Sequence, residues 1–211
     1  MKRLARHDVV RRVVRVGVVW LLSSLSLWSV HAPAMAVDRL DVRRAGGRYI
    51  VEFEARLEAP AQEVGEVLTD YESYPALDPR ILESRVDASR RHLHTKLRGC
   101  VGRLLCRTMT RVEEIVSTPD ALTATALPLE SDVKYGVTRS QWRVRDGGTQ
   151  VTYRLEIEPD FWVPPMFGPR LMIKTLREGT LSLFRNVETA AQARDTQKRE
   201  HLGSAPGADG S

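Results

Sequence analysis

Few residues of this sequence have the types and spacing that chemistry requires. His92 and His94 stand two positions apart, so on a strand both side chains would share one face and form a possible metal-binding pair. Leu93, Thr95 and Leu97 would then occupy the opposite, inner face. We therefore favour two solvated histidines and expect no metal site.

Carboxylates are the other candidates for catalysis. Asp70 and Asp78 border a predicted helical segment and could act as a pair, but such residues more often cap helices and turns. Glu113 and Glu114 are adjacent, so on a strand they point to opposite faces and cannot easily act together. Motifs for a nucleophile elbow, a zinc protease, a phosphate loop or a dinucleotide are absent from the sequence. We identify no catalytic residue and expect no cofactor.

Cys100 and Cys106 are the only cysteines, and in an oxidising compartment such a pair can form a disulfide. In an extended strand their Cα atoms would lie about 20 Å apart, whereas a disulfide needs them within about 7 Å. The chain must therefore turn between them, which Gly99 and Gly102 favour. We favour a structural disulfide over free thiols, and over a redox-active pair, because the spacing is not Cys-x-x-Cys.

Residues 1–36 have the three-part layout of a secretory signal peptide. Basic residues occupy the stretch from Lys2 to Arg15, and an uncharged, mostly apolar stretch follows from Val16 to Val30. Ala34-Met35-Ala36 then supplies a small-x-small pattern before Val37. We expect cleavage after Ala36 and a periplasmic or secreted protein, and the alternative is an uncleaved membrane anchor.

The net charge of +5 comes from this leader. Of the 32 basic and 27 acidic residues, six basic and one acidic lie in residues 1–36, which leaves 26 of each in the remainder. A neutral mature chain does not favour nucleic-acid binding, so we expect no nucleic-acid partner. Residues 37–193 have the length of one domain, and the polar residues 194–211 are expected to be disordered.

Strand periodicity dominates the mature chain. Apolar and polar residues alternate from Tyr49 to Leu57 and again over residues 139–157, where Asp146-Gly147-Gly148 marks a turn. Further strands are predicted at residues 39–44, 81–88, 92–97, 106–117 and 121–127. Because nearly all of them are joined by short links, we expect one antiparallel sheet of about seven strands.

Two segments have helical spacing. The first opens at Pro60 and ends near Asp70, and the second runs from about Pro165 to Ala193. This order predicts an α+β fold in which a long C-terminal helix lies across a curved antiparallel sheet. Gly179 inside that helix makes room either for a ligand or for close packing against the sheet.

The residues that follow the first long strand carry a family resemblance. Leu57-Glu58-Ala59-Pro60-Ala61-Gln62-Glu63-Val64 leads into Leu68-Thr69-Asp70-Tyr71-Glu72-Ser73-Tyr74-Pro75, and Asp78-Pro79-Arg80-Ile81 then enters a strand. This segment resembles the START-like (helix-grip) superfamily, on its polyketide cyclase/dehydrase and coenzyme Q-binding branch. The resemblance covers roughly residues 39–192. It departs at Ala76 and Leu77, where an aromatic residue is common, and the leader and cysteine pair look like an exported subgroup.

The resemblance implies a helix-grip fold whose sheet and C-terminal helix enclose an apolar cavity for a lipid, a quinone or a similar molecule. By position, the cavity would be lined by Trp142, Val144, Tyr153, Leu155, Phe161, Trp162, Met166, Met172, Leu176 and Leu183. The segment from Phe161 to Phe167, rich in aromatic residues, would form an apolar gate or a membrane-facing tip, or else plug the core.

We therefore expect a monomeric, non-catalytic protein that binds a hydrophobic small molecule and contacts membranes transiently. One alternative is a cyclase or dehydratase that uses polar residues such as Tyr153 for proton transfer. Another is a protein-interaction module whose interior is filled by its own side chains. An enclosed apolar void of several hundred Å³ would favour binding, convergent titratable groups would favour catalysis, and a packed interior would favour interaction.

Overall fold

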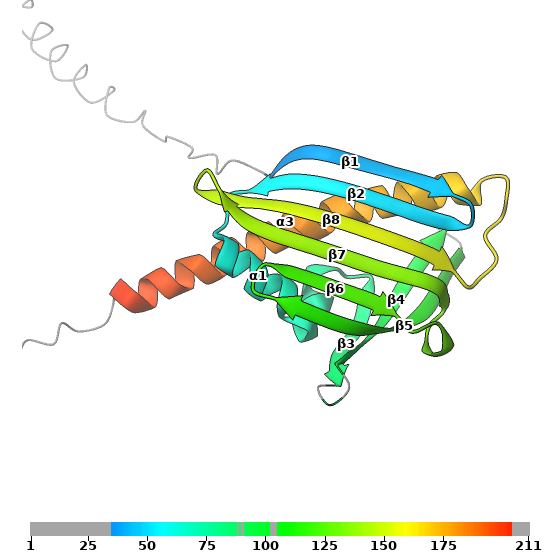
Figure 1. The fold of residues 1–211 in the computed structure, drawn as a ribbon, viewed down its shortest axis with the longest axis horizontal. Coiled ribbons are helices and arrows are strands. Elements are labelled where there is room, and N and C mark those ends of the chain that lie inside the picture. The colour runs from blue at the N-terminus through cyan, green and yellow to red at the C-terminus, as the bar shows by residue number, and fades with distance from the viewer. Residues whose placement is uncertain (1–34, 88, 90, 102–104, 204–211) are drawn as a thin grey trace, which may run out of the picture. The chain divides into compact units, whose positions relative to one another are not determined.

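The computed structural model describes residues 35–87, 89, 91–101 and 105–203 of the chain. Eight strands form one antiparallel sheet in the order β1-β2-β8-β7-β6-β5-β4-β3 (Figure 1). The strands are β1 (Ala36–Ala45), β2 (Arg48–Leu57), β3 (Ile81–Asp87), β4 (His92–Val101), β5 (Leu105–Thr118), β6 (Ala121–Ala126), β7 (Val133–Arg145) and β8 (Gly148–Pro159). The predicted α+β class is confirmed, with eight strands where about seven were expected.

Helical segments interrupt the sheet and close the chain. Between β2 and β3 lie α1 (Ala61–Thr69), the 3₁₀ segment η1 (Tyr71–Ser73) and α2 (Tyr74–Leu77), and η2 (Pro128–Glu130) links β6 to β7. The last element, α3 (Gly168–Gly203), runs along one face of the sheet (Figure 1). Across the described helices, none is apolar enough over its length to span a bilayer.

The C-terminal helix is longer than the sequence predicted. It continues to Gly203, so the expectation that disorder begins at residue 194 is wrong for residues 194–203. Ion pairs hold this polar extension, since Arg194 contacts Asp70 and Lys198 Nζ lies 2.8 Å from Glu63 Oε1 of α1. A search for apolar periodicity cannot detect a helix that is docked by charge. Residues 1–34 of the predicted leader and residues 204–211 fall outside the described residues.

The space between the sheet and α3 is filled mainly by aromatic and aliphatic side chains. The rings of Phe53 on β2 and Phe184 on α3 stack with centroids 4.7 Å apart, and Tyr153 on β8 packs edge-on against Phe184 at 5.3 Å. Trp142 on β7 packs against Gly65 of α1, and its Nε1 donates a hydrogen bond of 3.1 Å to the carbonyl of Pro119. These contacts fix the second half of α3 and α1 on the sheet.

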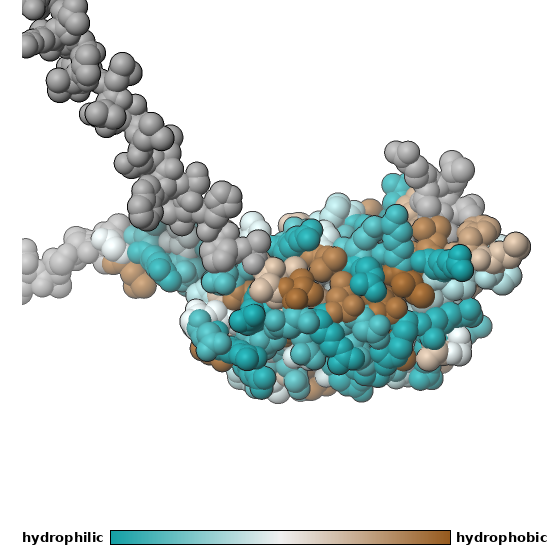
Figure 2. All heavy atoms as spheres, turned by 90° about the horizontal axis from the view of Figure 1, so that it is seen from above, coloured by the Kyte–Doolittle hydropathy of each residue, from teal (hydrophilic) through white to brown (hydrophobic). Residues whose placement is uncertain are grey.

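The first part of α3 is held less firmly. Between Gly168 and Gly179 none of its residues is buried. Its half-buried Ile173 and Leu176 pack on a small cluster of Val42, Val51 and Leu155. Seen from above, hydrophobic residues reach the surface between hydrophilic ones (Figure 2).

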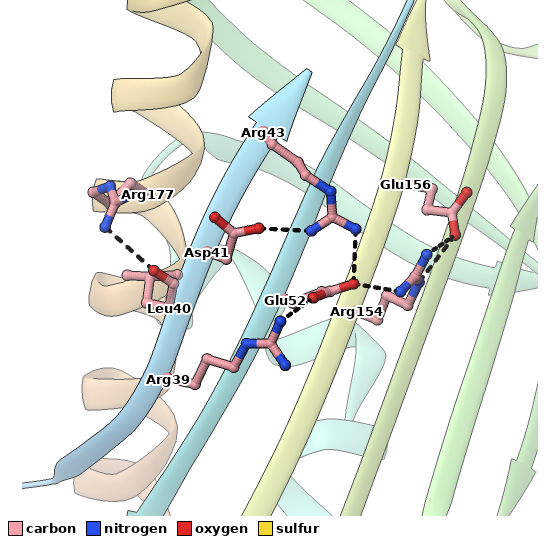
Figure 3. A network of polar contacts seen from close by, with 8 residues as sticks. All are labelled: Arg39, Leu40, Asp41, Arg43, Glu52, Arg154, Glu156 and Arg177. Carbon is pink, nitrogen blue, oxygen red and sulfur yellow. Dashed lines mark hydrogen bonds and ion pairs between the residues drawn. The ribbon is translucent and has the colours of Figure 1, made fainter. Parts of the chain in front are cut away.

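The opposite face of the sheet carries a charge network across β1, β2 and β8. Glu52 accepts hydrogen bonds from Arg39 (2.7 Å), Arg43 (3.0 Å) and Arg154 (2.6 Å) (Figure 3). The bond from Arg43 does most to lower the pKa of Glu52. Charged side chains on β1, an edge strand, also oppose edge-to-edge association with another sheet.

The predicted disulfide is present. Cys100 on β4 and Cys106 on β5 are register partners, with Cα atoms 4.0 Å apart and a bond between their sulfurs. Residues 102–104, where the sequence predicted a turn, are not among the described ones.

Candidate functional site

A small cavity lies between the sheet and the start of α3. Its volume is about 60 Å³, and its lining is mostly apolar: Leu97, Met109, Thr110, Arg111, Val133, Ile157, Pro159, Phe161 and Met172. It has room for only a few water molecules, whereas small-molecule sites usually measure about 300–1,000 Å³. A lipid-sized ligand therefore requires this part of the molecule to open.

A buried ion pair borders the cavity. Arg111, which lines it, and Glu113 stand at alternate positions of β5, and Arg111 Nη2 lies 2.8 Å from Glu113 Oε2. The side chain of Glu113 is 1% exposed and that of Arg111 is 23% exposed. Burial acts to lower the pKa of Arg111, but the nearby negative charge, Glu113 above all, outweighs it and raises the pKa.

This pair leaves hydrogen-bonding capacity unused. The charges are in contact, yet Arg111 Nε and both Glu113 oxygens are buried and have no hydrogen-bond partner within the described part of the chain. Unsatisfied buried polar groups are uncommon because each costs about 1–3 kcal/mol. Arg111 lines the apolar cavity, and a guanidinium there is suited to an oxygen acceptor on a ligand.

Two tyrosines lie near the pair. Burial raises the pKa of Tyr153 to about 12, while the charges of Arg111 and Glu113 act on it in opposite directions. Burial likewise raises the pKa of Tyr74, whose hydroxyl donates a 2.8 Å hydrogen bond to the carbonyl of Leu68. Both phenols are therefore protonated at neutral pH and can act as hydrogen-bond donors rather than as bases.

A second ion pair, between Arg80 and Asp78, lies against Gly179 of α3. Arg80 Nε donates to the Asp78 carboxylate at 2.9 and 3.1 Å. Burial opposes the ionisation of Asp78, but these hydrogen bonds outweigh it and lower its pKa. A Cβ atom at Gly179 would lie only 2.4 Å from Arg80 Nη1. The glycine thus makes room for an arginine side chain, which neither of the sequence-based interpretations had considered.

The loop between β8 and α3 exposes several large apolar side chains. Trp162 is 78% exposed, Met166 is 90% exposed and Phe167 is 55% exposed, so these three residues do not plug the core. Phe161 turns inward to line the cavity, and the guanidinium of Arg107 lies 5.9 Å from the centre of its ring.

The structure separates the ten predicted lining residues into three groups. Phe161 and Met172 line the cavity. Five others belong to the packed interior: Trp142, Tyr153, Leu155, Leu176 and Leu183. The remaining three are exposed and line no enclosed space: Val144, Trp162 and Met166.

The exposed residues correct the sequence-based assignment. Val144 shares its sheet face with Trp142, but it lies at the end of β7 and is 76% exposed, because the helices do not cover it. Strand alternation identifies a face, but it does not say where the covering layer ends. Trp162 and Met166 extend from a loop, to which no periodicity applies.

The other candidate residues do not form a site of their own. Asp70 contacts Arg194 and Asp78 contacts Arg80, so the two carboxylates serve separate ion pairs. The rings of His92 and His94 lie 6.5 Å apart. Over residues 35–203 as described, three potential metal-ligating side chains nowhere gather into one group.

Sequence reasoning missed the Arg111–Glu113 pair, although a signal for it exists. Met109, Arg111, Glu113 and Ile115 alternate along β5 on one face. Two charged residues on the same face as buried Ile115 mark a polar site inside the fold.

Solved structures with similar folds are distantly related in sequence. An aromatase/cyclase, Zhui, from Streptomyces sp. R1128 has a TM-score of 0.58 and 16% identity over 70% of this chain and 95% of its own. A START superfamily protein from Mycobacterium smegmatis gives 0.53 and 17%, over 68% of this chain and 97% of its own. A STAR-related lipid transfer protein fragment from Xanthomonas axonopodis gives 0.51 and 16%, over 74% and 99%.

These similarities support the helix-grip fold. No curated protein matches the sequence significantly. The family described as polyketide cyclase/dehydrase and lipid transport matches residues 48–188, which span the elements from β2 to the middle of α3. The match covers the strands, α1 and the part of α3 that enclose the cavity and the buried ion pair. This chain belongs to the polyketide cyclase/dehydrase and lipid transport family.

Proposed function

We propose that this protein binds a hydrophobic small molecule with at least one oxygen acceptor, between the sheet and the start of α3. The observation that carries the proposal is the apolar cavity with Arg111 at its edge. Burial of apolar ligand surface would supply affinity at about 25 cal/mol per Å². The unpartnered Arg111 Nε would orient the oxygen.

A lipid-sized ligand does not fit a cavity of about 60 Å³, so binding requires the start of α3 to move. Residues 169–178 of α3 contribute no buried side chain, whereas Phe184, Val187 and Ala191 further along are fully buried. Segments with few buried contacts open at the lowest free-energy cost. The first three turns of α3 and the loop before them would therefore lift while the rest of the helix stays docked, which would enlarge the cavity.

We also propose that the exposed loop contacts a membrane when ligand is exchanged. Trp162, Met166 and Phe167 present apolar surface in the loop that also contains Phe161, which lines the cavity, and tryptophan suits a membrane interface. Two cations near this end, Arg107 and Lys134, are paired with Asp132 and Asp160. Insertion of apolar side chains, rather than charge, would therefore drive the contact. Export through the predicted leader would place the protein in a periplasm, where its disulfide is favoured.

Native mass spectrometry and organic extraction of protein purified from the periplasm test the main proposal. Oleate and a short-chain ubiquinone serve as added probes. Met172→Trp introduces a bulky side chain at the cavity, and Met166→Trp makes the same change at an exposed position. We expect Met172→Trp to lose binding and Met166→Trp to retain it. Absence of any bound molecule in wild type, or equal binding by both variants, would contradict the proposal.

A second candidate function is catalysis of the cyclase or dehydratase type. The convergence of Tyr153, Tyr74, Arg111 and Glu113 favours it, and one similar structure is an aromatase/cyclase. A protonated Tyr153 could donate a proton to a ligand oxygen. Turnover of a poly-β-ketone separates the two functions. Under the binding proposal neither wild type nor Tyr153→Phe turns it over, whereas under catalysis wild type does and Tyr153→Phe does not, although the variant still binds the probes.

A further inference from the structure

Glu188 on α3 is a buried carboxylate that receives two backbone N–H groups from distant parts of the chain. Its Oε1 accepts a hydrogen bond from the nitrogen of Glu58 at 2.9 Å, and its Oε2 accepts one from the nitrogen of Met35 at 3.1 Å. The residue is 7% exposed. It therefore joins α3 to the segment before α1 and to the residue that precedes β1.

Within the described part of the chain, the carboxylate of Glu188 has no basic partner. Three glutamates are buried within the described ranges. Glu63 lies 2.8 Å from Lys198 and Glu113 lies 2.8 Å from Arg111, but among the same residues no basic side chain comes within 4.0 Å of Glu188. Buried charges are normally paired, because leaving one uncompensated is costly.

We propose that the missing cation is the α-ammonium group of Met35, created when the leader is cleaved between Ala34 and Met35. This inference rests on the proposed export of the chain and not on ligand binding. Ala32-Pro33-Ala34 has the same small-x-small pattern as Ala34-Met35-Ala36. Hydrolysis by a leader peptidase breaks the Ala34–Met35 amide, and water supplies the hydroxyl of the new Ala34 carboxyl and a hydrogen to the Met35 nitrogen.

The same nitrogen atom then meets Glu188 with a positive charge. A free α-amino group has a pKa of about 7.7–8.0, so it is mostly protonated at neutral pH, and a charge-assisted hydrogen bond is about twice as strong as a neutral one. Cleavage after Ala36 would instead remove Met35 and leave Glu188 Oε2 without its donor. It would also remove Ala36, which pairs with Arg56 of β2.

Two substitutions distinguish the two cleavage sites when the full chain is exported. Ala32→Arg disrupts only the pattern that ends at Ala34, and Ala36→Arg disrupts only the pattern that ends at Ala36. N-terminal sequencing and intact mass are measured on the periplasmic product. We expect wild type and Ala36→Arg to begin at Met35, and Ala32→Arg to lose that product. A wild-type product that begins at Val37 or keeps its leader, or a block of processing by Ala36→Arg, would overturn the proposal.

A stability comparison tests the role of Glu188 separately. A chain that begins at Met35 is compared with one that begins at Ala34, in which the Met35 nitrogen remains an amide. The extension should increase the unfolding equilibrium constant roughly tenfold, from the difference between charged and neutral hydrogen bonds. In the Glu188→Gln background it should have little effect. An equal effect in both backgrounds would show that no ion pair forms with Glu188.

Discussion

The Arg111–Glu113 pair offers the sharpest test of the interior site. Arg111→Met would leave the carboxylate of Glu113, which is 1% exposed, without its cation. Breaking a buried ion pair in this way costs about 3–5 kcal/mol, whereas replacing both partners with apolar residues is often neutral or stabilising. We therefore expect Arg111→Met to be strongly destabilised and Arg111→Met/Glu113→Leu to approach wild-type stability.

The size of the effect makes it measurable. For a domain of this length, 1 kcal/mol shifts the Tm by roughly 2–4 °C, so the single substitution should lower it by about 10 °C. Urea unfolding followed by tryptophan fluorescence gives the corresponding free energies. Lys96→Met/Glu83→Leu removes an ion pair between β4 and β3 whose side chains are 47% and 69% exposed, and as a control it should change stability by less than about 1 kcal/mol.

Ligand binding adds a second measurement on the same variants. If Arg111 Nε holds a ligand oxygen, the refolded double variant should bind the short-chain ubiquinone about 10- to 100-fold more weakly, since a charged hydrogen bond is worth about 1.5–3 kcal/mol. A double variant as unstable as Arg111→Met would refute the account of the buried charge. Unchanged affinity in that variant would refute the role of Arg111 in recognition.

Three further predictions concern the fold. Gly65→Ala should lower stability by about 1–2 kcal/mol in urea unfolding despite the higher helix propensity of alanine, because the new Cβ would lie 2.5 Å from Trp142 Nε1; a gain in stability would disprove the contact. The pKa of Tyr153 is raised to about 12 from 10.0, so the stability that its buried, protonated hydroxyl contributes is complete below pH 10 and is lost towards pH 12. Tyr153→Phe should therefore lose less stability than wild type as the pH rises from 10 to 12. Parallel stability curves for the two proteins would contradict this. Reduction should lower the Tm of wild type by the equivalent of about 2–2.5 kcal/mol and should not affect Cys100→Ser/Cys106→Ser, whereas an equal response of both proteins would exclude the disulfide.

Local patterns explain why the strands could be predicted so closely. The hairpin around residues 45–48 and the turn at Asp146-Gly147 carry glycines with positive φ, and Asp146 itself has a φ of 50°. Glycine and aspartate at such positions signal a turn without reference to the rest of the chain. The end of α3 was not predictable in this way, because Lys198 and Arg194 are held by α1 and by Asp70.

The interior could be predicted only in part. The alternation of apolar and polar residues identified the inward face of β7 and β8. It did not show which residues of that face are covered, since Trp142 packs on Gly65 whereas Val144 is exposed. Arg111 and Glu113 were readable as inward charges on β5, yet only the packing around them shows that their hydrogen-bonding capacity is unmet.

The sequence by itself determined the order of the strands and helices along the chain, the antiparallel class of the sheet and the family. These follow from residue spacing, turn residues and motifs that act over short stretches of chain. Only the tertiary structure decided that Phe53 and Phe184 stack between the sheet and α3 and that the cavity beside the start of α3 measures about 60 Å³. It also decided that Glu188 meets the nitrogen of Met35. Volume, burial and charge pairing depend on side chains that are far apart in the sequence and come together only when the sheet and α3 pack.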